Sequence, residues 1–265
     1  MQGALAACED WKSEGMACAG RLLRQPRYNV SMRREWKSMK KMALIIRLSL
    51  MMFILLVWTS QARTEGFPVK SLPSVGNSLS DYIPSGWTVG DQASGDLNGD
   101  GIPDLAAILV QGGPDFNSNK ADDEPQRALI VLIGRDKDKF TLAGINDKLL
   151  QCKGCGGIKE SVGISIKKGV IIVSQMSGSR EFAIETWRFR YDPRTQRFVT
   201  IGRDLETGDG MRGTGKIESF NYLTGRKMTE SYRYDESGEH KIATSTKKET
   251  GPRETSFIED VKPSY

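Results

Sequence analysis

Residues 181–191 have the sequence EFAIETWRFRY, and this stretch decides the fold class. Its second half places Trp187, Phe189 and Tyr191 on one face of an extended chain, with Arg188 and Arg190 on the other. Such alternation predicts a strand with one buried and one solvated face, as antiparallel sheets provide. The three rings could also form a platform for sugars or bases. A core face explains the alternation more often, so we assign them to the core.

Further strands are predicted on both sides of this stretch. Residues 105–110 and 128–133 are apolar runs typical of well-buried strands. The polar residues 112–126 between them predict a solvated loop of a long hairpin, a place that can also carry function. Lys167-Lys168-Gly169 is a turn signal. The remaining strands are expected at residues 162–166, 170–173, 198–201, 217–222, 227–234 and 241–246.

Long helical periodicity is absent, and only a short helix near residues 79–83 is expected. The fold class is therefore predicted to be mainly β, an antiparallel sandwich or a twisted meander with at most short helices.

The beginning of the chain has the pattern of an export signal. Six Lys and Arg residues lie within residues 33–47, and an apolar run follows at residues 48–58. Ser60-Gln61-Ala62 supplies small residues at the positions that a signal peptidase recognises. We therefore expect a signal peptide at residues 32–62, with cleavage after Ala62. A retained anchor is the alternative, but an apolar run of 11 residues is short of the roughly 20 that span a bilayer.

The segments around this signal complete the expected organisation. Residues 1–31 are expected to be an upstream extension, with translation beginning at Met32, Met39 or Met42. Residues 63–85 are rich in Pro, Ser and Gly and predict an extended lead-in segment. Residues 86–265 are predicted to form the β-rich domain.

The charge of the expected mature chain bears on its partners. Of 38 Lys and Arg and 33 Asp and Glu, 10 basic and 4 acidic residues precede Arg63, which leaves 28 basic and 29 acidic residues. A near-neutral chain argues against a nucleic-acid partner. We expect a monomer without a membrane span after cleavage, periplasmic or secreted. The absence of Asn-x-Ser/Thr sequons after Ala62 favours a bacterial source.

Residues 96–104, with the sequence DLNGDGIPD, form the most specific motif of the chain. Calcium prefers six to eight hard oxygen ligands, and a tight loop can supply them at positions 1, 3, 5, 7 and 9. The predicted ligands are the side chains of Asp96, Asn98, Asp100 and Asp104 and the main-chain carbonyl of Ile102. Ala107 stands at position 12, which excludes an ordinary EF-hand. A metal-free polar turn, or a loop that holds sodium or magnesium, is the alternative to a Ca²⁺ site.

The loop resembles the calcium loops of FG-GAP and VCBS-type repeats, which lie between strands. The residues that carry the resemblance are Asp96, Asn98, Asp100, Gly101 and Asp104. One copy is present, whereas a propeller needs several blades. Stretches at residues 155–157, 187–191, 201–202 and 221–225 resemble a family of exported bacterial proteins. This resemblance covers approximately residues 80–230 and implies a periplasmic or secreted single domain.

Cys152-Lys153-Gly154-Cys155 is a C-x-x-C pair followed by Gly156-Gly157. An oxidising compartment favours a local disulfide between Cys152 and Cys155. A redox-active pair and half of a zinc site are the alternatives. Two glycines open a helix poorly, which disfavours a thioredoxin-like pair, and His240 is the only nitrogen donor for zinc.

Catalytic patterns are sparse, and no catalytic residue is assigned. His240 lies in the polar context Glu239-His240-Lys241, which is typical of a solvated turn. Nucleophile elbows, P-loops and dinucleotide fingerprints are missing from the sequence. Glu181 and Glu185 are a conceivable glycosidase pair, although carboxylates on a strand usually form its wet face.

Two functional hypotheses follow. The first is an exported non-catalytic β domain with a structural calcium site and an unidentified surface or envelope partner. The alternative is a hydrolase acting on envelope or extracellular polymers. A redox function of Cys152 and Cys155 is a third hypothesis and ranks below both.

Overall fold

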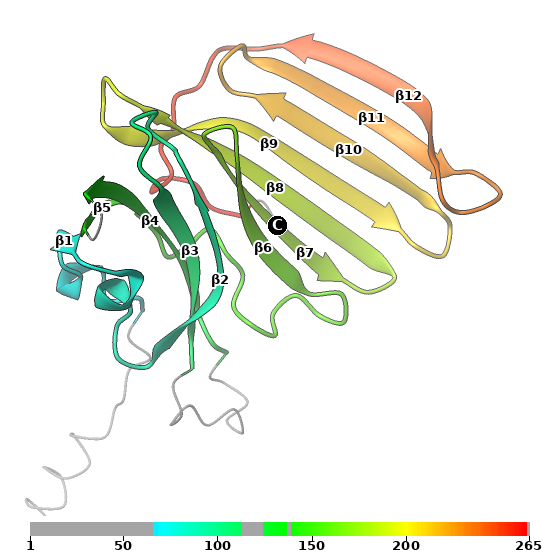
Figure 1. The fold of residues 1–265 in the computed structure, drawn as a ribbon. Coiled ribbons are helices and arrows are strands. Elements are labelled where there is room, and N and C mark those ends of the chain that lie inside the picture. Colours follow the sequence, from blue (N-terminus) through cyan, green and yellow to red (C-terminus); the bar gives the residue numbers. More distant parts are fainter. Residues whose placement is uncertain (1–65, 113–123, 137–138, 264–265) are drawn as a thin grey trace, which may run out of the picture. The chain divides into compact units, whose positions relative to one another are not determined.

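Strand β8 (Glu181–Asp192) contains the alternating stretch and lies inside a seven-stranded sheet (Figure 1). The computed structural model describes residues 66–112, 124–136 and 139–263. These residues belong to the compact unit Arg63–Tyr265. The expected upstream extension and signal peptide lie outside the described residues.

The strands form two antiparallel sheets. The five-stranded sheet has the order β1-β5-β4-β3-β2, and the seven-stranded sheet has the order β12-β11-β10-β9-β8-β7-β6. The bounds of the first sheet are β1 (Val75–Gly76), β2 (Trp87–Gly95), β3 (Asp104–Gln111), β4 (Arg127–Asp136) and β5 (Lys139–Asn146). Besides β8, the second sheet contains β6 (Ser161–Lys167), β7 (Val170–Gly178), β9 (Arg197–Asp209), β10 (Thr214–Asn221), β11 (Arg226–Tyr234) and β12 (Lys241–Thr250).

The predicted fold class is confirmed. From β2 to β5 and from β6 to β12, each strand pairs with the next one along the chain, so both sheets are antiparallel meanders. The described helices are the short 3₁₀ turns η1 (Val69–Ser71) and η2 (Leu79–Tyr82). Within the described ranges, no helix is long and apolar enough to cross a membrane.

Local sequence signals explain the hairpins. Lys168 and Gly169 join β6 to β7 with φ of 51° and 73°, as a tight hairpin turn requires. The strands β3 and β4 pair as the predicted long hairpin, and most of their connector, residues 113–123, lies outside the described residues.

The central residues of β3 and β4 are apolar, as burial of both faces of this hairpin requires. One face of this hairpin carries Ile108, Leu129 and Val131, which belong to the main core together with residues of β7, β8 and β9. The opposite face carries Leu109 and Ile130, which belong to a second core that includes the N-terminal residues Phe67, Tyr82 and Trp87. The five-stranded sheet therefore lies between the seven-stranded sheet and the lead-in segment.

The lead-in segment is attached more firmly than an extended chain with occasional anchors. Tyr82 is fully buried, and its hydroxyl donates a hydrogen bond of 2.5 Å to the carbonyl of Phe140. The short strand β1 pairs with β5. Burying a large side chain contributes about 1.5–3 kcal/mol, so these contacts hold the segment on the sheet.

The aromatic stripe of β8 lies in the core, as predicted. Trp187 is 5% exposed and Phe189 is fully buried, and their rings stack with centroids 6.4 Å apart. Tyr191 packs against the same core and against Phe198 of β9. These rings therefore serve packing rather than a ligand platform.

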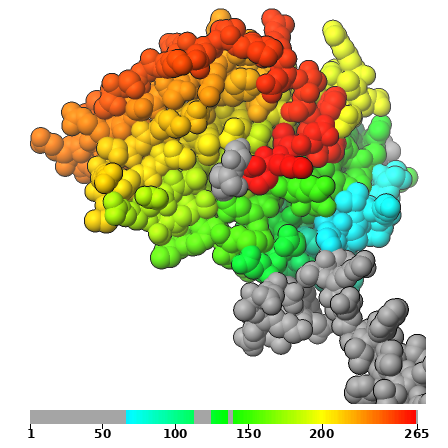
Figure 2. Space-filling view, turned by 180° about the vertical axis from the view of Figure 1, so that it is seen from behind, coloured from blue at the N-terminus to red at the C-terminus, as the bar shows by residue number. Residues whose placement is uncertain are grey.

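The C-terminal segment returns from the edge strand β12 to the core, and in Figure 2 its red atoms lie beside the green part of the chain. Ile258 and Val261 are buried. The buried side chain of Asn146 donates hydrogen bonds to the carbonyls of Ile258 (2.5 Å) and Val261 (2.9 Å). Its oxygen accepts from the amides of Lys148 and Leu149. One polar side chain thus joins the end of β5 to the end of the chain.

Strands β10 to β12 form the outer part of the seven-stranded sheet (Figure 1). Every residue of β12 is exposed, and this strand is rich in Lys and Thr, which suits an edge that resists pairing with other chains. On β10 the carboxylate of Glu218 forms ion pairs of 3.1 Å with Lys216 and 3.2 Å with Lys227. Charge pairing across strands, rather than a second apolar layer, suits this region to water.

Candidate functional site

The predicted calcium loop connects β2 to β3, so it lies between strands as its resemblance implies. Gly99 and Gly101 adopt φ of 85° and 84°, a left-handed backbone that glycine takes without strain. The carboxylate of Asp96 accepts hydrogen bonds from the amides of Gly99 (2.7 Å) and Gly101 (3.1 Å). The loop is therefore held in a tight turn by its own side chains.

Asn98 and Asp100 make the next turns of the loop. The side-chain oxygen of Asn98 accepts from the amide of Asp100 at 3.0 Å, and Asp100 accepts from the amide of Ile102 at 2.8 Å. The Asn98 side-chain amide also donates to Asp100 at 2.8 Å. The hydrogen bonds that the Asn98 side chain and the Ile102 amide donate to Asp100 lower the pKa of its carboxyl group, which is ionised at neutral pH.

Asp104 is the anchor of the loop and is fully buried. Its two oxygens accept hydrogen bonds from the amide of Leu97 (2.7 Å) and from the amide of Gly134 on β4 (2.8 Å). Burial raises the pKa of Asp104, the charge of Asp100 adds to this, and the backbone amides oppose it. Asp104 therefore links the loop, β3 and β4 through one carboxylate.

The donor set suits a hard cation. The loop contains three carboxylates, and within residues 66–112, 124–136 and 139–263 no Lys or Arg forms an ion pair with any of them. Each carboxylate oxygen keeps a further lone pair beside its amide partner. The three carboxylates are not gathered within 4.8 Å of one another, so ion binding requires the exposed Asp96 and Asp100 to turn toward Asp104.

The cysteine pair lies in the connection between β5 and β6. The structure joins Cys152 to Cys155 by a disulfide, and their Cα atoms are 5.3 Å apart. This distance lies in the usual range for disulfides and agrees with the predicted pairing.

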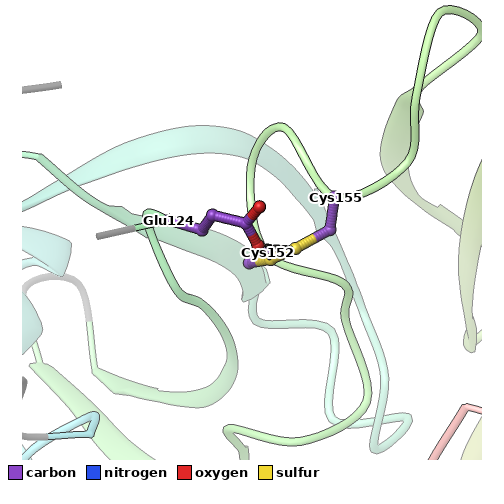
Figure 3. A group of neighbouring side chains, drawn as sticks. All are labelled: Glu124, Cys152 and Cys155. Atoms are coloured by element: carbon purple, nitrogen blue, oxygen red, sulfur yellow. Dashed lines mark hydrogen bonds between the residues drawn. A yellow bond between two sulfur atoms is a disulfide. The ribbon is translucent and has the colours of Figure 1, made fainter. Parts of the chain in front are cut away.

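No local sequence pattern identified the acidic partner of this pair. Glu124, at the start of the segment that leads into β4, has its Oε2 atom 2.8 Å from the sulfur of Cys152 and in contact with the sulfur of Cys155 (Figure 3). Of the described Cys, His, Asp and Glu residues, these three are the group whose ligand atoms all lie within 4.8 Å of one another.

An ion pair holds the backbone of the cysteine loop. The guanidinium of Arg127 and the carboxylate of Glu160 are 2.5 Å apart, and their side chains are 10% and 13% exposed. Arg127 donates to the carbonyls of Gln151 and Cys152, and Glu160 accepts from the amide of Gly154 at 2.7 Å. Although burial raises the pKa of Glu160, the hydrogen bonds from Arg127 and Gly154 outweigh it and lower that pKa below its ordinary value.

This lowered pKa predicts that the variant Glu160→Gln loses stability by an amount that depends on pH. The pair contributes stability above the unfolded-state pKa of about 4.3, and this contribution disappears as the pH falls through the lower folded-state pKa. At pH 7 the variant is expected to be less stable by about 2 kcal/mol, with the gap closing in acid. Urea unfolding across pH measures it. The control is Glu236→Gln, because Glu236 is exposed in a turn. A stability difference between Glu160→Gln and wild type that is equal at all pH values would contradict the role of the ion pair.

The residues considered for catalysis are either exposed or part of a buried ion pair. His240 is exposed in the turn between β11 and β12, as its context predicted. Glu185 is fully buried, 2.8 Å from Arg203, and accepts from Gln175 at 3.2 Å. Glu185 therefore belongs to a buried ion pair, whereas Glu181 is exposed, so the two carboxylates do not share one wet face of β8.

No protein-family model, curated protein or solved structure matches the chain. The likeness of the loop to FG-GAP and VCBS-type repeats thus rests on its own residues.

Proposed function

We propose that this chain is an exported, non-catalytic β domain in which Ca²⁺ bound at residues 96–104 fixes the connection between β2 and β3. The observation that carries the proposal is the position of Asp104. This carboxylate is buried and bonded to the amides of Leu97 and Gly134, so an ion at the loop would act on two strands of the core sheet at once.

The electrostatics of the loop support a divalent ion. Burial disfavours the ionised form of Asp104, as its raised pKa indicates, and Asp100 adds negative charge beside it. A calcium ion would supply the opposite charge and would take oxygen ligands from Asp96, Asn98, Asp100, Asp104 and the Ile102 carbonyl. Ion binding would therefore favour the ionised form of Asp104 and a loop in which Asp96 and Asp100 turn toward it.

The export part of the proposal rests on the sequence before Arg63 and on the disulfide, which suits an oxidising compartment. The domain would act by binding a partner at the surface or in the envelope, in the periplasm or outside the cell. N-terminal sequencing of chain recovered from these compartments should begin within a few residues of Arg63. Full-length chain confined to the cytoplasm would contradict export.

Calcium is expected to raise the melting temperature, and Asp100→Ala is expected to remove this response. Binding to the native state alone adds about 2.7 kcal/mol at a free calcium concentration of 100 times Kd. For a domain of this size the rise is about 5–10 °C. Scanning calorimetry with calcium or chelator measures it.

Asp147→Ala is the matched control, because Asp147 lies outside the loop and its variant should keep the full response to calcium. The variant Asp100→Ala should still fold, since the apolar strands β3 and β4 carry the core. An equal calcium-dependent rise in Asp100→Ala and wild type would show that the loop is not the site.

A further inference from the structure

Two sulfur atoms and one carboxylate meet at a single exposed place on the molecule (Figure 3). Glu124 and Cys155 are exposed and Cys152 is half-buried, so all three can be reached from solvent. The carboxylate faces both sulfurs through the same oxygen, Oε2. A carboxylate gains little stabilisation from a neutral disulfide. The same carboxylate beside two thiolates and a metal ion completes a ligand set.

The backbone holds this arrangement without help from the sulfurs. The amide of Lys153 donates to the carbonyl of Pro125 at 2.7 Å, which ties the cysteine loop to the residue next to Glu124. The amide of Cys155 donates to the carbonyl of Cys152 at 3.2 Å. Arg127 and Glu160 bind further backbone groups of the same loop. Reduction of the disulfide removes none of these hydrogen bonds, so the backbone that carries the three side chains keeps its links.

We propose that Cys152, Cys155 and Glu124 form a binding site for Zn²⁺ when the disulfide is reduced. This site is separate from the calcium loop and does not depend on the proposed function. Thiolates favour soft or borderline ions, and Zn²⁺ accepts both thiolate and carboxylate ligands. Three protein ligands leave the fourth tetrahedral position for water or a small ligand.

The oxidation state of the sulfurs controls the site. A dithiol reductant gives two electrons and two protons to the disulfide, which becomes two thiols, while the reductant becomes a disulfide. Zn²⁺ then displaces the two thiol protons as it binds the thiolates. Without a cation the nearby Glu124 carboxylate disfavours ionisation of the two thiols, and Zn²⁺ supplies the positive charge that lets both sulfurs bind as thiolates.

The test measures zinc on the intact exported chain, oxidised and after reduction with a phosphine under anaerobic conditions. Competition with a chromophoric chelator gives affinity and stoichiometry. The reduced chain is expected to bind one Zn²⁺ and the oxidised chain none at this site. Loss of an outer-shell partner typically weakens metal binding by about 10- to 100-fold, so loss of the ligand in Glu124→Gln should weaken it by at least as much. Cys152→Ser should abolish binding.

Controls separate the site from the calcium loop and from misfolding. Asp100→Ala should bind zinc like wild type, and the far-ultraviolet circular dichroism of Glu124→Gln should be unchanged. Cobalt in place of zinc should give a sulfur-to-metal charge-transfer band that Cys152→Ser lacks. Equal zinc binding by reduced wild type and Cys152→Ser, or by wild type and Glu124→Gln, would overturn the proposal.

Discussion

Replacing Asn146 with alanine is expected to lower the free energy of unfolding by about 4 kcal/mol, because four hydrogen bonds, three of them buried, end on this one side chain. The carbonyls of Ile258 and Val261 lose their donor, and the amides of Lys148 and Leu149 lose their acceptor. Each unsatisfied buried group costs about 1–3 kcal/mol, and water that enters the cavity recovers part of it.

Urea unfolding at neutral pH measures this loss, and hydrogen exchange should show faster exchange at residues 256–261. Asn221→Ala is the matched control, since Asn221 is exposed and its side chain accepts from Thr224 in a turn. Its expected cost is about 1 kcal/mol or less. Equal losses in both variants would mean that Asn146 does not hold the C-terminal segment on the core.

Replacing Glu185 with leucine is expected to cost about 3 kcal/mol. Glu185 is fully buried beside Arg203, and removing one partner of a buried ion pair typically costs about 3–5 kcal/mol. The low end applies because the side chain of Arg203 keeps 23% of its exposure and can reach water. Gln175 also loses an acceptor but still donates to the carbonyl of Leu149.

The double variant Glu185→Leu with Arg203→Leu separates a lost pair from lost packing. Removing both charges should recover about 1 kcal/mol or more relative to Glu185→Leu alone, because no guanidinium then remains without its carboxylate. Equilibrium unfolding of the two single variants and the double variant gives the coupling energy. Additive losses would contradict a buried pair.

The fold class followed from local pattern because both sheets are meanders. From β2 to β5 and from β6 to β12 each strand pairs with its neighbour in the sequence, so alternation in β8 and the turn at Lys168 and Gly169 indicate much of the topology. Local pattern did not predict β2, β5 or the pairing of β1 with β5. Strand β1 has two residues, too few for a periodic pattern, and its partner lies far along the chain.

The site was predictable only where its residues are neighbours in sequence. The loop motif identified Asp96 and Asp104, and its glycines adopt the conformation that a tight turn needs. The contact between Asp104 and Gly134 and the position of Glu124 beside the cysteines join residues about 30 apart. Such contacts depend on strand pairing, and no local spacing encodes them. The sequence disfavoured zinc at the cysteines because His240 is the only nitrogen donor. The fold, however, places the carboxylate of Glu124 beside both sulfurs.

A calorimetric titration of the intact exported wild-type chain with calcium tests the central claim most directly. The expected result is a saturable heat with one ion per chain, which disappears in Asp100→Ala and persists when the cysteines are reduced. The titration would contradict the claim if the wild-type chain gave only heats of dilution, because residues 96–104 would then be a polar turn without a metal.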